Sequence, residues 1–576
     1  MLPPHVSIPI DPDFPKTLPA LLVARSQATP EQPFLFFPER SAQTNQITYA
    51  QLARQCFAFA NWLTGQKFHG QGQPTATTVG LLMPNIPEFL TGYWGAMCAG
   101  CIAVPINTLL KSPEVQFILD NAQCKVVLTT RQFLPILAPC LPQLPHLKTL
   151  IIADDPTVDA GLSDDANLNP VNIHAPQQAE TSNLSDVLDL ANVTSHSNLP
   201  EFARALAPQI TPETVAEIIY TSGTTGNPKG VMLTHQNLIT DAYYIKTWFS
   251  LTPHSRMLCI LPLFHVNGEV VTMMTPLVAG SSVVLHRQFS ASRFWQDIAQ
   301  YQVELFSTVP TILSILIKAR PDAFQKPDSL RLGICGAAPL PPEVQTQFEA
   351  CFNVPIIEGY GLSETTCYSS FNPPDIARRK LGSIGLAVGN QMAIVNTAGQ
   401  VLPSGQIGEI AIRGENVMLG YFNNPDATQK ALLLNLYSAS NTPDTQQHYP
   451  GPWFLSGDLG DVDDAGFFRI LGRSKEMIIR GGENIYPKEV DDCLYLHPAV
   501  EHAATVGIED TKYGETVKSF VVLKPGFEPT EALAETLMQW TRTRMADFKC
   551  PEAIAFVDEI PKGPTGKLLR RALKTL

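Results

Sequence analysis

This chain of 576 residues lacks long apolar runs, an excess of basic residues and a recognisable leader. No stretch of about 18 consecutive apolar residues occurs, so we expect no segment that spans a bilayer. The formal net charge is −13, which argues against the concentrated basic face that nucleic-acid binding requires. The N-terminus has no basic stretch followed by an apolar core, and we therefore expect no secretory signal and a cytoplasmic location.

A disulfide framework is also missing. The eleven cysteines are scattered and odd in number, which is typical of a large chain in a reducing compartment. Cys98 and Cys101 form a C-x-x-C pair, but no second pair and no nearby histidine accompanies them. We therefore interpret them as packed thiols rather than as a metal or redox site.

The length exceeds what one compact core supports, and two to four domains are expected. Ala153–Asp186 is rich in Asp, Asn, Ser and Pro, which predicts an exposed linker or long loop. A second polar segment, "SASNTPDTQQHYPG", ends at Gly451 and predicts a surface loop. No internal repeat is visible.

One region can be placed from its hydrophobic pattern. "LRLGICG", ending at Gly336, predicts a buried strand, and Val344, Phe348 and Cys351 fall on one helical face after it. "VPIIEGYG" then predicts a second strand, so the three elements form a right-handed parallel crossover. Because ligands bind beyond the carboxyl ends of such strands, Gly336–Ala338 and Glu358–Tyr360 are expected side by side at a crevice.

The last hundred residues have the pattern of a separate unit. "VEHAATVGI" and "VKSFVVL" predict strands, and Leu533, Leu537 and Trp540 mark one face of a helix. A small α+β domain fits this order.

A glycine-rich and hydroxyl-rich run, "YTSGTTGNPKG" at Tyr220–Gly230, follows the apolar stretch "VAEIIY". A Walker loop is excluded, because Pro228 occupies the position of its second glycine and Gly230 that of its hydroxyl residue. Its backbone N–H groups and hydroxyls could surround phosphate oxygens. A mobile loop without a ligand remains the alternative at this point.

Further motifs follow this run in a fixed order. They are "PLFHVNG" (262–268), "GAAPL" (336–340), "YGLSET" (360–365), "GEIAIRGENVMLGY" (408–421), "SGDLG" (456–460), "GRSKEMIIRGGENIYPKEV" (472–490) and "PKGPTGKLLRR" (561–571). With the glycine-rich run, they resemble the signatures of the adenylate-forming superfamily, in its acyl-CoA synthetase or fatty-acid–CoA ligase branch. The resemblance covers the chain from about residue 20 to its end.

The resemblance implies an α/β fold in two domains. Residues 1–473 would form a large N-terminal AMP-binding domain of several subdomains, with mixed and parallel sheets flanked by helices. Residues 474–576 would form a small, mobile α+β domain that carries the adenylation lysine. The implied substrates are ATP with Mg²⁺, a carboxylic acid and the thiol of coenzyme A.

The resemblance also implies a set of ATP- and AMP-binding residues. These are Thr221, Ser222, Gly223, Thr224, Thr225, Gly226, Lys229, Gly336, Ala337, Ala338, Glu358, Gly359, Tyr360, Gly361, Ser363, Asp458 and Arg473. Within the set, Asp458 and Arg473 would bind the ribose and Tyr360 would stack on adenine. Thr221 and Glu364 would hold Mg²⁺, because hydroxyl and carboxylate oxygens are hard ligands for a hard ion.

Three residues are expected to be catalytic by resemblance: Lys567, His265 and Glu364. Lys567 would contact the acid and the α-phosphate during adenylation, and His265 would lie near the acyl carboxylate, at the mouth of the thiol channel. Lys475 would be the hinge about which the small domain rotates. After rotation, Gly481–Glu483 would cover the pantetheine channel, where glycines permit a close approach.

The expected acyl pocket is lined by small or apolar residues: Val266, Val270, Gly333, Gly359 and Cys367. The stretches around them contain no lysine or arginine and no aspartate, which disfavours dicarboxylic acids and amino acids as substrates. A medium- to long-chain fatty acid is the first expectation, and an aryl or cinnamate-like acid the second. The alternatives are an acyl-AMP ligase that loads an acyl carrier protein, and an inactive regulatory homologue.

Overall fold

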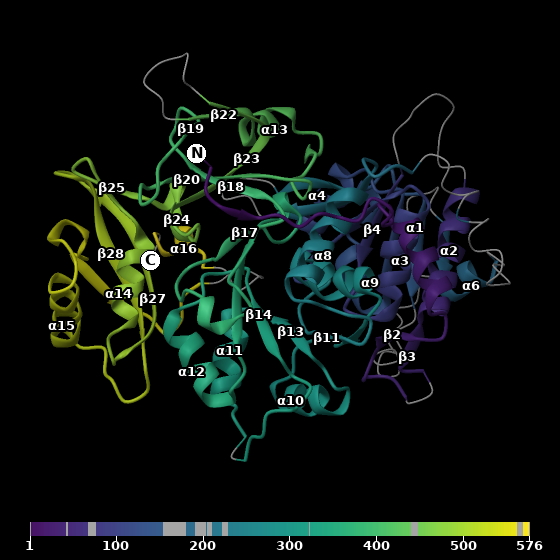
Figure 1. Ribbon diagram of the computed structural model, residues 1–576, viewed down its shortest axis with the longest axis horizontal. Helices are drawn as coiled ribbons and strands as arrows, with labels where there is room; N and C mark the ends of the chain where they lie inside the picture. Colours follow the sequence, from purple (N-terminus) through teal and green to yellow (C-terminus); the bar gives the residue numbers. More distant parts are fainter. Residues whose placement is uncertain are drawn as a thin grey trace.

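A computed structural model describes most of the chain (Figure 1). The described residues are 2–41, 44–66, 77–153, 180–190, 203, 210–221, 228–321, 323–438, 447–561 and 568–574. Within these ranges, no helix combines the length and the apolar character needed to cross a bilayer.

The first large sheet has ten strands. In spatial order they are β1 (His5–Val6), β17 (Leu386–Val388), β16 (Ser370–Phe371), β15 (Ile356–Tyr360), β14 (Leu332–Cys335), β13 (Leu305–Thr308), β11 (Arg256–Cys259), β12 (Ser282–Leu285), β2 (Pro33–Phe36) and β3 (Gln46–Thr48). The strands from β15 to β2 are parallel. Their nearly continuous apolar sequences fit a sheet covered on both faces.

The second large sheet has eight strands. They are β21 (Gly420–Tyr421), β10 (Lys229–Thr234), β9 (Val215–Thr221), β5 (Ile102–Pro105), β4 (Thr78–Leu82), β6 (Val126–Thr130), β7 (Thr149–Ala153) and β8 (Glu180–Asn183). β9 and β10 are antiparallel, and their register pairs Thr221 with Lys229. The glycine-rich run therefore connects the ends of these two neighbouring strands.

Helices cover both faces of the two large sheets. One continuous core joins both sheets to α1 (Leu18–Ala28), α2 (Tyr49–Gly65), α3 (Pro87–Cys98), α8 (His235–Trp248), α9 (Thr275–Ala279) and a π-helix (Asn267–Met274). A second core holds α10 (Ala291–Gln300), α11 (Pro310–Lys318) and α12 (Pro342–Phe352) against the ten-stranded sheet. A third holds α4 (Ser112–Asn121) and α5 (Leu134–Leu137) against the eight-stranded sheet. The result is a layered α/β architecture.

The predicted parallel crossover is confirmed. β14, α12 and β15 follow one another, and β14 pairs in parallel with β15. Phe348 of α12 is buried against the sheet, as its spacing predicted. The carboxyl ends of both strands therefore meet at one edge, where the motif residues follow them.

A six-stranded sheet forms the next part of the chain. Its strands are β20 (Gly408–Arg413), β18 (Gln391–Val395), β19 (Gln400–Val401), β22 (Leu432–Ser438), β23 (His448–Val462) and β24 (Phe468–Arg473). Helix α13 (Pro425–Ala431) precedes β22. β23 pairs with β24 so that Asp458 lies opposite Arg473.

The C-terminal part forms its own sheet and core, as predicted (Figure 1). Its strands are β26 (Glu483–Ile485), β25 (Ile478–Arg480), β28 (Gly514–Leu523), β27 (Val500–Asp510) and β29 (Ala553–Phe556), with helices α14 (Pro487–Tyr495), α15 (Glu531–Arg542) and α16 (Arg570–Leu573). The α/β class with a large N-terminal and a small C-terminal domain is thus confirmed. The boundary after residue 473 stays a prediction.

Two loop predictions were wrong in part. Within the polar segment predicted as a linker, Glu180–Asn183 forms edge strand β8, and α6 (Leu184–Leu190) begins directly after it. Leu184 and Val187 are buried in the main core, which outweighs the polar composition around them. The second polar segment ends earlier than predicted, because β23 begins at His448.

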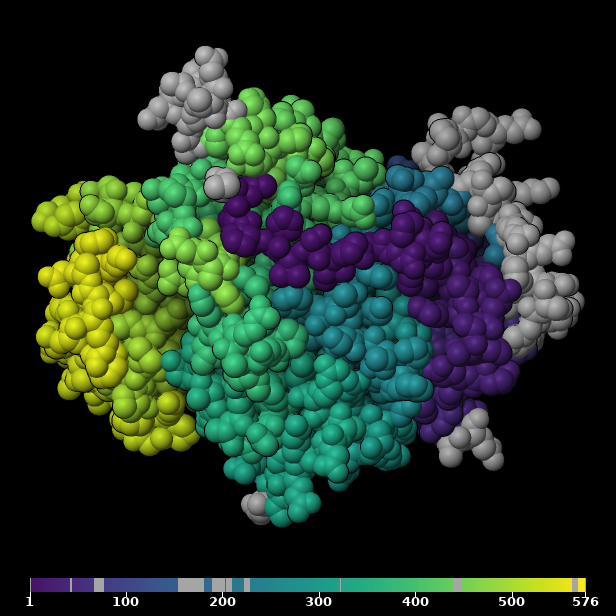
Figure 2. Space-filling view, viewed as in Figure 1, coloured from purple at the N-terminus to yellow at the C-terminus, as the bar shows by residue number. Residues whose placement is uncertain are grey.

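The N-terminal segment runs across the surface of the molecule before α1 begins. Figure 2 shows it in purple, crossing the boundary between the green and teal parts of the chain. β1 fixes its start by pairing with β17. Cys98 and Cys101 are buried in the main core at the end of α3, and burial raises the pKa of both thiols, in agreement with the interpretation as packed side chains.

Candidate active site

Tyr360, Asp458 and Arg473 meet where the ten-stranded and six-stranded sheets adjoin. The Tyr360 hydroxyl donates a hydrogen bond of 2.7 Å to Asp458 Oδ2, and Arg473 Nε lies 2.6 Å from Asp458 Oδ1. Burial acts to lower the pKa of Arg473, but Asp458 together with Tyr360, Glu364 and Glu476 outweighs it, so the pKa lies above its ordinary value. The arrangement holds an oriented carboxylate at the position where ribose binding was predicted.

A second group gathers around Glu364. The Tyr421 hydroxyl donates to Glu364 Oε1 at 2.9 Å, and Lys229 Nζ lies 4.7 Å from the centre of the Tyr421 ring. Thr221 pairs with Lys229 across the β9–β10 hairpin. Tyr421 was inside a quoted motif, but the sequence assigned it no role.

The donor set near Glu364 fits the predicted Mg²⁺. The Thr221 hydroxyl and the Glu364 carboxylate are both half-buried oxygen ligands, and β10 packs against the 3-10 turn Ser363–Thr365 that carries Glu364. Among the described residues, no group of three or more His, Cys, Asp and Glu side chains could hold a metal. A hard ion that takes few protein ligands and completes its shell with phosphate and water is compatible with this set.

The expected adenine-binding turn lies beside Tyr368. A Cβ built on Gly336 would lie 2.1 Å from the Tyr368 hydroxyl oxygen, so only glycine fits there. The next residue, Ala337, is exposed and has a φ of 68°, a left-handed conformation that costs free energy in a residue other than glycine. Glu358 Oε1 accepts the Leu340 N–H at 3.2 Å and so closes the turn against β15. Burial raises the pKa of Glu358 to about 7.

His265 lies two residues before the π-helix, and its side chain is half-buried. Burial lowers the pKa of His265 to about 4, so its ring is neutral at neutral pH. Its Nε2 atom has no hydrogen-bond partner within the described part of the chain. π-Helices are rare and occur often at functional sites, which fits a turn that places this ring.

The π-helix also fixes the neighbouring tyrosine. Asn267 Oδ1 accepts from the Ser307 hydroxyl at 2.5 Å, and Asn267 Nδ2 donates to the Tyr368 hydroxyl at 3.2 Å. This chain of bonds joins β13, the π-helix and the wall behind Gly336. The sequence did not identify Asn267 or Tyr368, although Asn267 lies inside "PLFHVNG".

The residues of the expected acyl pocket divide into two kinds. Val270 and Cys367 are buried and Val266 is half-buried, as apolar wall residues would be. Gly333 and Gly359 instead leave room for packed rings, because a Cβ on each would lie 2.4 Å from Phe306 and 2.5 Å from Phe371, respectively. Acyl contact by any of the five stays a prediction.

Buried acids lie close to this pocket, and the sequence analysis did not foresee them. After burial itself, the charges of Asp241 and Glu269 are the largest influences that raise the pKa of the Cys367 thiol. Asp241 comes from α8, and its Oδ2 atom accepts the Tyr368 N–H at 3.1 Å. Asp241 lies far from the quoted motifs in the sequence, and only the fold brings it here.

The turn that follows Glu364 is held by two asparagine side chains. Asn416 Nδ2 donates to the carbonyl oxygens of Thr365 and Tyr368, at 3.2 and 3.1 Å. Asn390 Nδ2 donates to the carbonyl oxygen of Ser369 at 2.9 Å. Both asparagines are buried and belong to the connections around β18 and β20.

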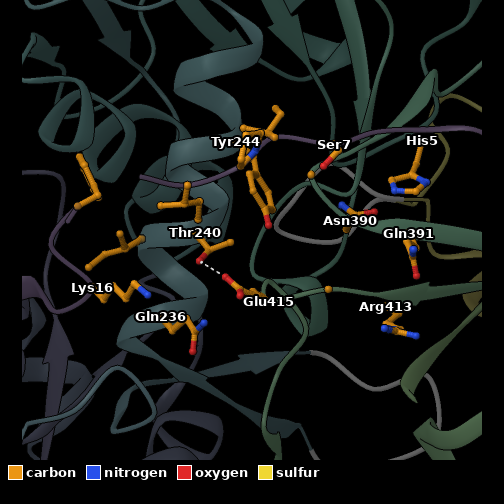
Figure 3. A pocket seen from close by; sticks show the side chains of 17 residues that line it. His5, Ser7, Lys16, Gln236, Thr240, Tyr244, Asn390, Gln391, Arg413 and Glu415 are labelled. Carbon is orange, nitrogen blue, oxygen red and sulfur yellow. Dashed lines mark hydrogen bonds between the residues drawn. The ribbon is translucent and has the colours of Figure 1, made fainter. Parts of the chain in front are cut away.

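A cavity of about 400 Å³ lies behind this turn, under the N-terminal segment (Figure 3). Asn390 and Glu415 line it, and the Thr240 hydroxyl donates to Glu415 Oε2 at 3.3 Å near its centre. None of the predicted site residues that the structure describes lines this cavity. It is separate from the candidate active site.

The predicted hinge and channel residues lie in the connection to the C-terminal sheet. Lys475 is exposed in a 3-10 turn (Ser474–Glu476) between β24 and β25. Gly481 and Gly482 have φ values of 60° and 89° and form the two-residue turn of the β25–β26 hairpin, followed by Glu483. Positive φ at both positions is the conformation that glycine favours in such a turn. All three are exposed, and their roles stay predictions.

Six predicted residues lie outside the part of the chain that the structure describes. They are Ser222, Gly223, Thr224, Thr225, Gly226 and Lys567. Their contacts with phosphate, and the catalytic role of the lysine, therefore stay predictions.

Family models match most of the chain. The model described as AMP-binding enzyme matches residues 22–422, and the model of the AMP-binding enzyme C-terminal domain matches residues 489–567. A sulfoacetate–CoA ligase of Cupriavidus necator is 34% identical over 98% of this chain and 98% of its own length. A long-chain-fatty-acid–CoA ligase of Bacillus subtilis is 32% identical over 97% of this chain and 94% of its own.

Solved structures agree with these relatives. The anthranilate CoA ligase AuaEII, in complex with anthranoyl-AMP, has a TM-score of 0.79 at 26% identity, with 98% of each chain covered. Together the comparisons support ATP-dependent ligation of an acid to coenzyme A, while the acids in the relatives' names differ from one another.

Proposed function

Because the chain belongs to the AMP-binding enzyme family of the adenylate-forming superfamily, we propose that it converts a hydrophobic monocarboxylic acid into its coenzyme A thioester. A medium- to long-chain fatty acid is the substrate we favour. An oxygen of the acid forms a bond to the α-phosphorus of ATP, and pyrophosphate leaves. The sulfur of coenzyme A then attacks the acyl carbonyl carbon, the thiol loses its proton, and AMP leaves.

The described residues would divide this work between them. Asp458 would accept hydrogen bonds from the ribose hydroxyls, while Arg473 and Tyr360 hold its carboxylate in place. The neutral ring of His265 would lie beside the acid at the thiol channel. Thr221 and Glu364 would hold Mg²⁺, which supplies positive charge to the phosphate oxygens when it is bound. Lys567 would add positive charge at the α-phosphate.

The substrate proposal rests on the lack of cationic side chains in the stretches around the expected acyl pocket. Among the described residues of "FHVNGEVVTMM", "STVPTI" and "EGYGLSETT", no lysine or arginine occurs. Two buried acids, Asp241 and Glu269, influence Cys367 instead. A second anionic group on the substrate would lie beside these acids without a cation to pair with, which is costly in a buried site.

A panel of acids tests the proposal. We expect octanoate and palmitate to drive pyrophosphate release and acyl-CoA formation, and sulfoacetate and oxalate to drive neither. Cinnamate and holo-acyl carrier protein belong in the same panel, because they test the aryl acid and the carrier protein. Efficient turnover of sulfoacetate would overturn the proposed substrate class, and no pyrophosphate release with any acid would overturn the activity.

Measuring adenylation and thioester formation separately tests the role of Lys567. We expect Lys567→Ala to abolish adenylation but to leave thioester formation from supplied acyl-AMP largely intact. Lys562→Ala, in the same glycine- and proline-rich stretch, is the matched control and should retain both half-reactions. If both half-reactions fell together in Lys567→Ala, the assigned role would be wrong.

A further inference from the structure

Two glutamates face each other inside the main core, away from any cation. Glu217 lies on β9 and is 0% exposed, and Glu269 lies on the π-helix and is 2% exposed. The Tyr93 hydroxyl donates to Glu217 Oε2 at 2.9 Å, and the two carboxyls lie within hydrogen-bonding reach of each other. Within the described part of the chain, Glu217 Oε1 and both Glu269 oxygens have no other hydrogen-bond donor. A carboxyl can donate to a carboxylate only if one of the two retains its proton.

The surroundings favour that retained proton. The titratable groups that influence the pair or lie next to it are the Tyr93 hydroxyl of α3, the Cys367 thiol and, beyond it, Asp241 of α8. Within the described part of the chain, no lysine, arginine or histidine forms an ion pair with either glutamate. Burial raises the pKa of Glu217 to about 7, and burial together with the Glu217 charge raises the pKa of Glu269 well above its ordinary value.

The pair joins two segments that lead into the candidate site. Glu217 is four residues before Thr221 on the same strand, and Glu269 is four residues after His265. The Glu269 N–H donates to the His265 carbonyl oxygen at 3.1 Å, so the two residues lie on adjacent turns of one helical segment. β9 belongs to the eight-stranded sheet, whereas the π-helix packs against β11 and β13 of the ten-stranded sheet.

We propose that one proton shared between Glu217 and Glu269 links β9 to the π-helix and thereby sets the distance between Thr221 and His265. Both glutamates are positioning residues that touch no substrate. The link matters for catalysis through the roles proposed above for Thr221 and His265. An ion pair could not replace it without burying a cation in this core.

The sign of the pH effect follows from proton linkage. Between the ordinary pKa of glutamic acid, about 4.3, and the raised pKa of Glu269, the folded protein holds a proton that the unfolded chain has lost. Stability attributable to Glu269 therefore falls as pH rises, by about tenfold in the folding equilibrium constant per pH unit. Above the raised pKa the pair becomes two buried carboxylates, and the link opens.

Glu269→Gln tests this directly, because an amide N–H donates to Glu217 at every pH. We compare the folding equilibrium constants of Glu269→Gln and the wild type. The ratio of variant to wild type should rise about tenfold for each pH unit between pH 5 and 8. We expect kcat/KM at pH 7 to stay within about threefold, and its alkaline decline to shift to higher pH. Glu343→Gln, the same change at an exposed glutamate, is the matched control and should show neither effect.

Infrared spectroscopy gives a readout that needs no substrate. Protonated carboxyls give a carbonyl band, and at pH 8 this band should be weaker in Glu269→Gln than in the wild type, because one such carboxyl is missing. Asp241, whose pKa burial also raises, contributes to the band in both proteins. Glu217→Gln provides the mirror arrangement, with the amide donating to Glu269, and should also fold. The proposal is overturned if the band is equally strong in both proteins, if Glu269→Gln follows the wild-type pH dependence, or if neither amide variant folds. Since stability and infrared spectra do not depend on turnover, these outcomes stay separate from a failure of the proposed activity.

Discussion

Acids are buried in two places near the candidate site. On the ribose side the acid is Asp458, and on the π-helix side the acids are Glu217 and Glu269. The two sides stabilise their acids differently. Asp458 is paired with the Arg473 guanidinium at 2.6 Å. Among the described residues, the partners of Glu217 and Glu269 are Tyr93 and each other. The comparison shows two ways of accommodating a buried carboxyl. One is beside a guanidinium, and the other is beside a hydroxyl and a second carboxyl, where burial raises the pKa of both glutamates.

Removing the charged acid of the ribose side should have the largest effect. Asp458→Asn deletes an anion that would accept hydrogen bonds from both ribose hydroxyls, and charge-assisted bonds contribute about 1.5–3 kcal/mol each. We expect kcat/KM for ATP to fall about 10²–10³-fold, measured by pyrophosphate exchange. Asp461→Asn removes the acid of a similar cross-strand pair with Arg469 on the same two strands and should retain activity. Equal losses in the two variants would contradict the ribose role.

Removing the guanidinium should make the ribose side behave like the π-helix side. Arg473→Met leaves Asp458 buried without a cation, and we expect a loss of about 2 kcal/mol in the free energy of unfolding at pH 8. The loss should shrink toward pH 5, because the unpaired carboxyl then takes up a proton. Denaturant midpoints at both pH values measure this. The double variant with Asp458→Asn should recover most of the stability, and strictly additive losses would count against the pairing.

His265 provides a test on the π-helix side in which stability is lost as pH falls, whereas the contribution of Glu269 is lost as pH rises. Burial lowers its pKa to about 4, whereas an unfolded histidine titrates near 6.5. The unfolded chain therefore binds more protons between these values, and stability is lost as pH falls from about 6.5 toward 4. We expect His265→Gln to lose less stability than the wild type over that range, by about 1–2 kcal/mol at pH 5 in thermal or denaturant unfolding. Parallel pH curves for the two proteins would show that the ring is not buried as described.

The smallest effect should come from the tyrosine that supports Asp458. Tyr360→Phe removes the hydroxyl that donates at 2.7 Å but keeps the ring that was predicted to stack on adenine. One hydrogen bond to a charged group is worth about 1.5 kcal/mol at the lower end, so KM for ATP should rise roughly tenfold with little change in kcat. A larger loss for Tyr360→Phe than for Asp458→Asn would reverse the order of importance assigned here.

Residues near in sequence to the motifs could be foreseen, and those brought in by the fold could not. The crossover of β14, α12 and β15 was readable from hydrophobic spacing, and with it the positions of Gly336 and Glu358. Tyr421 lies inside a quoted motif, but only the fold brings it to Glu364, and Asp241 reaches the site from a segment outside the motifs. Strand β8 was missed because the composition of its segment is polar. The burial of Leu184 and Val187 directly after it fixes the segment against the main core.

The side chains of Asn390 and Asn416 hold the carbonyl oxygens of the turn after Glu364 from outside that turn. Within the turn, the hydroxyls of Thr365 and Thr366 add hydrogen bonds to Leu362 and to the Asn416 carbonyl oxygen. Cys367, in the middle of the turn, is buried, and we expect its exchange for a residue of similar volume to leave Glu364 in place. This scaffold offers a position at which acid selectivity could be redesigned without rebuilding the nucleotide site.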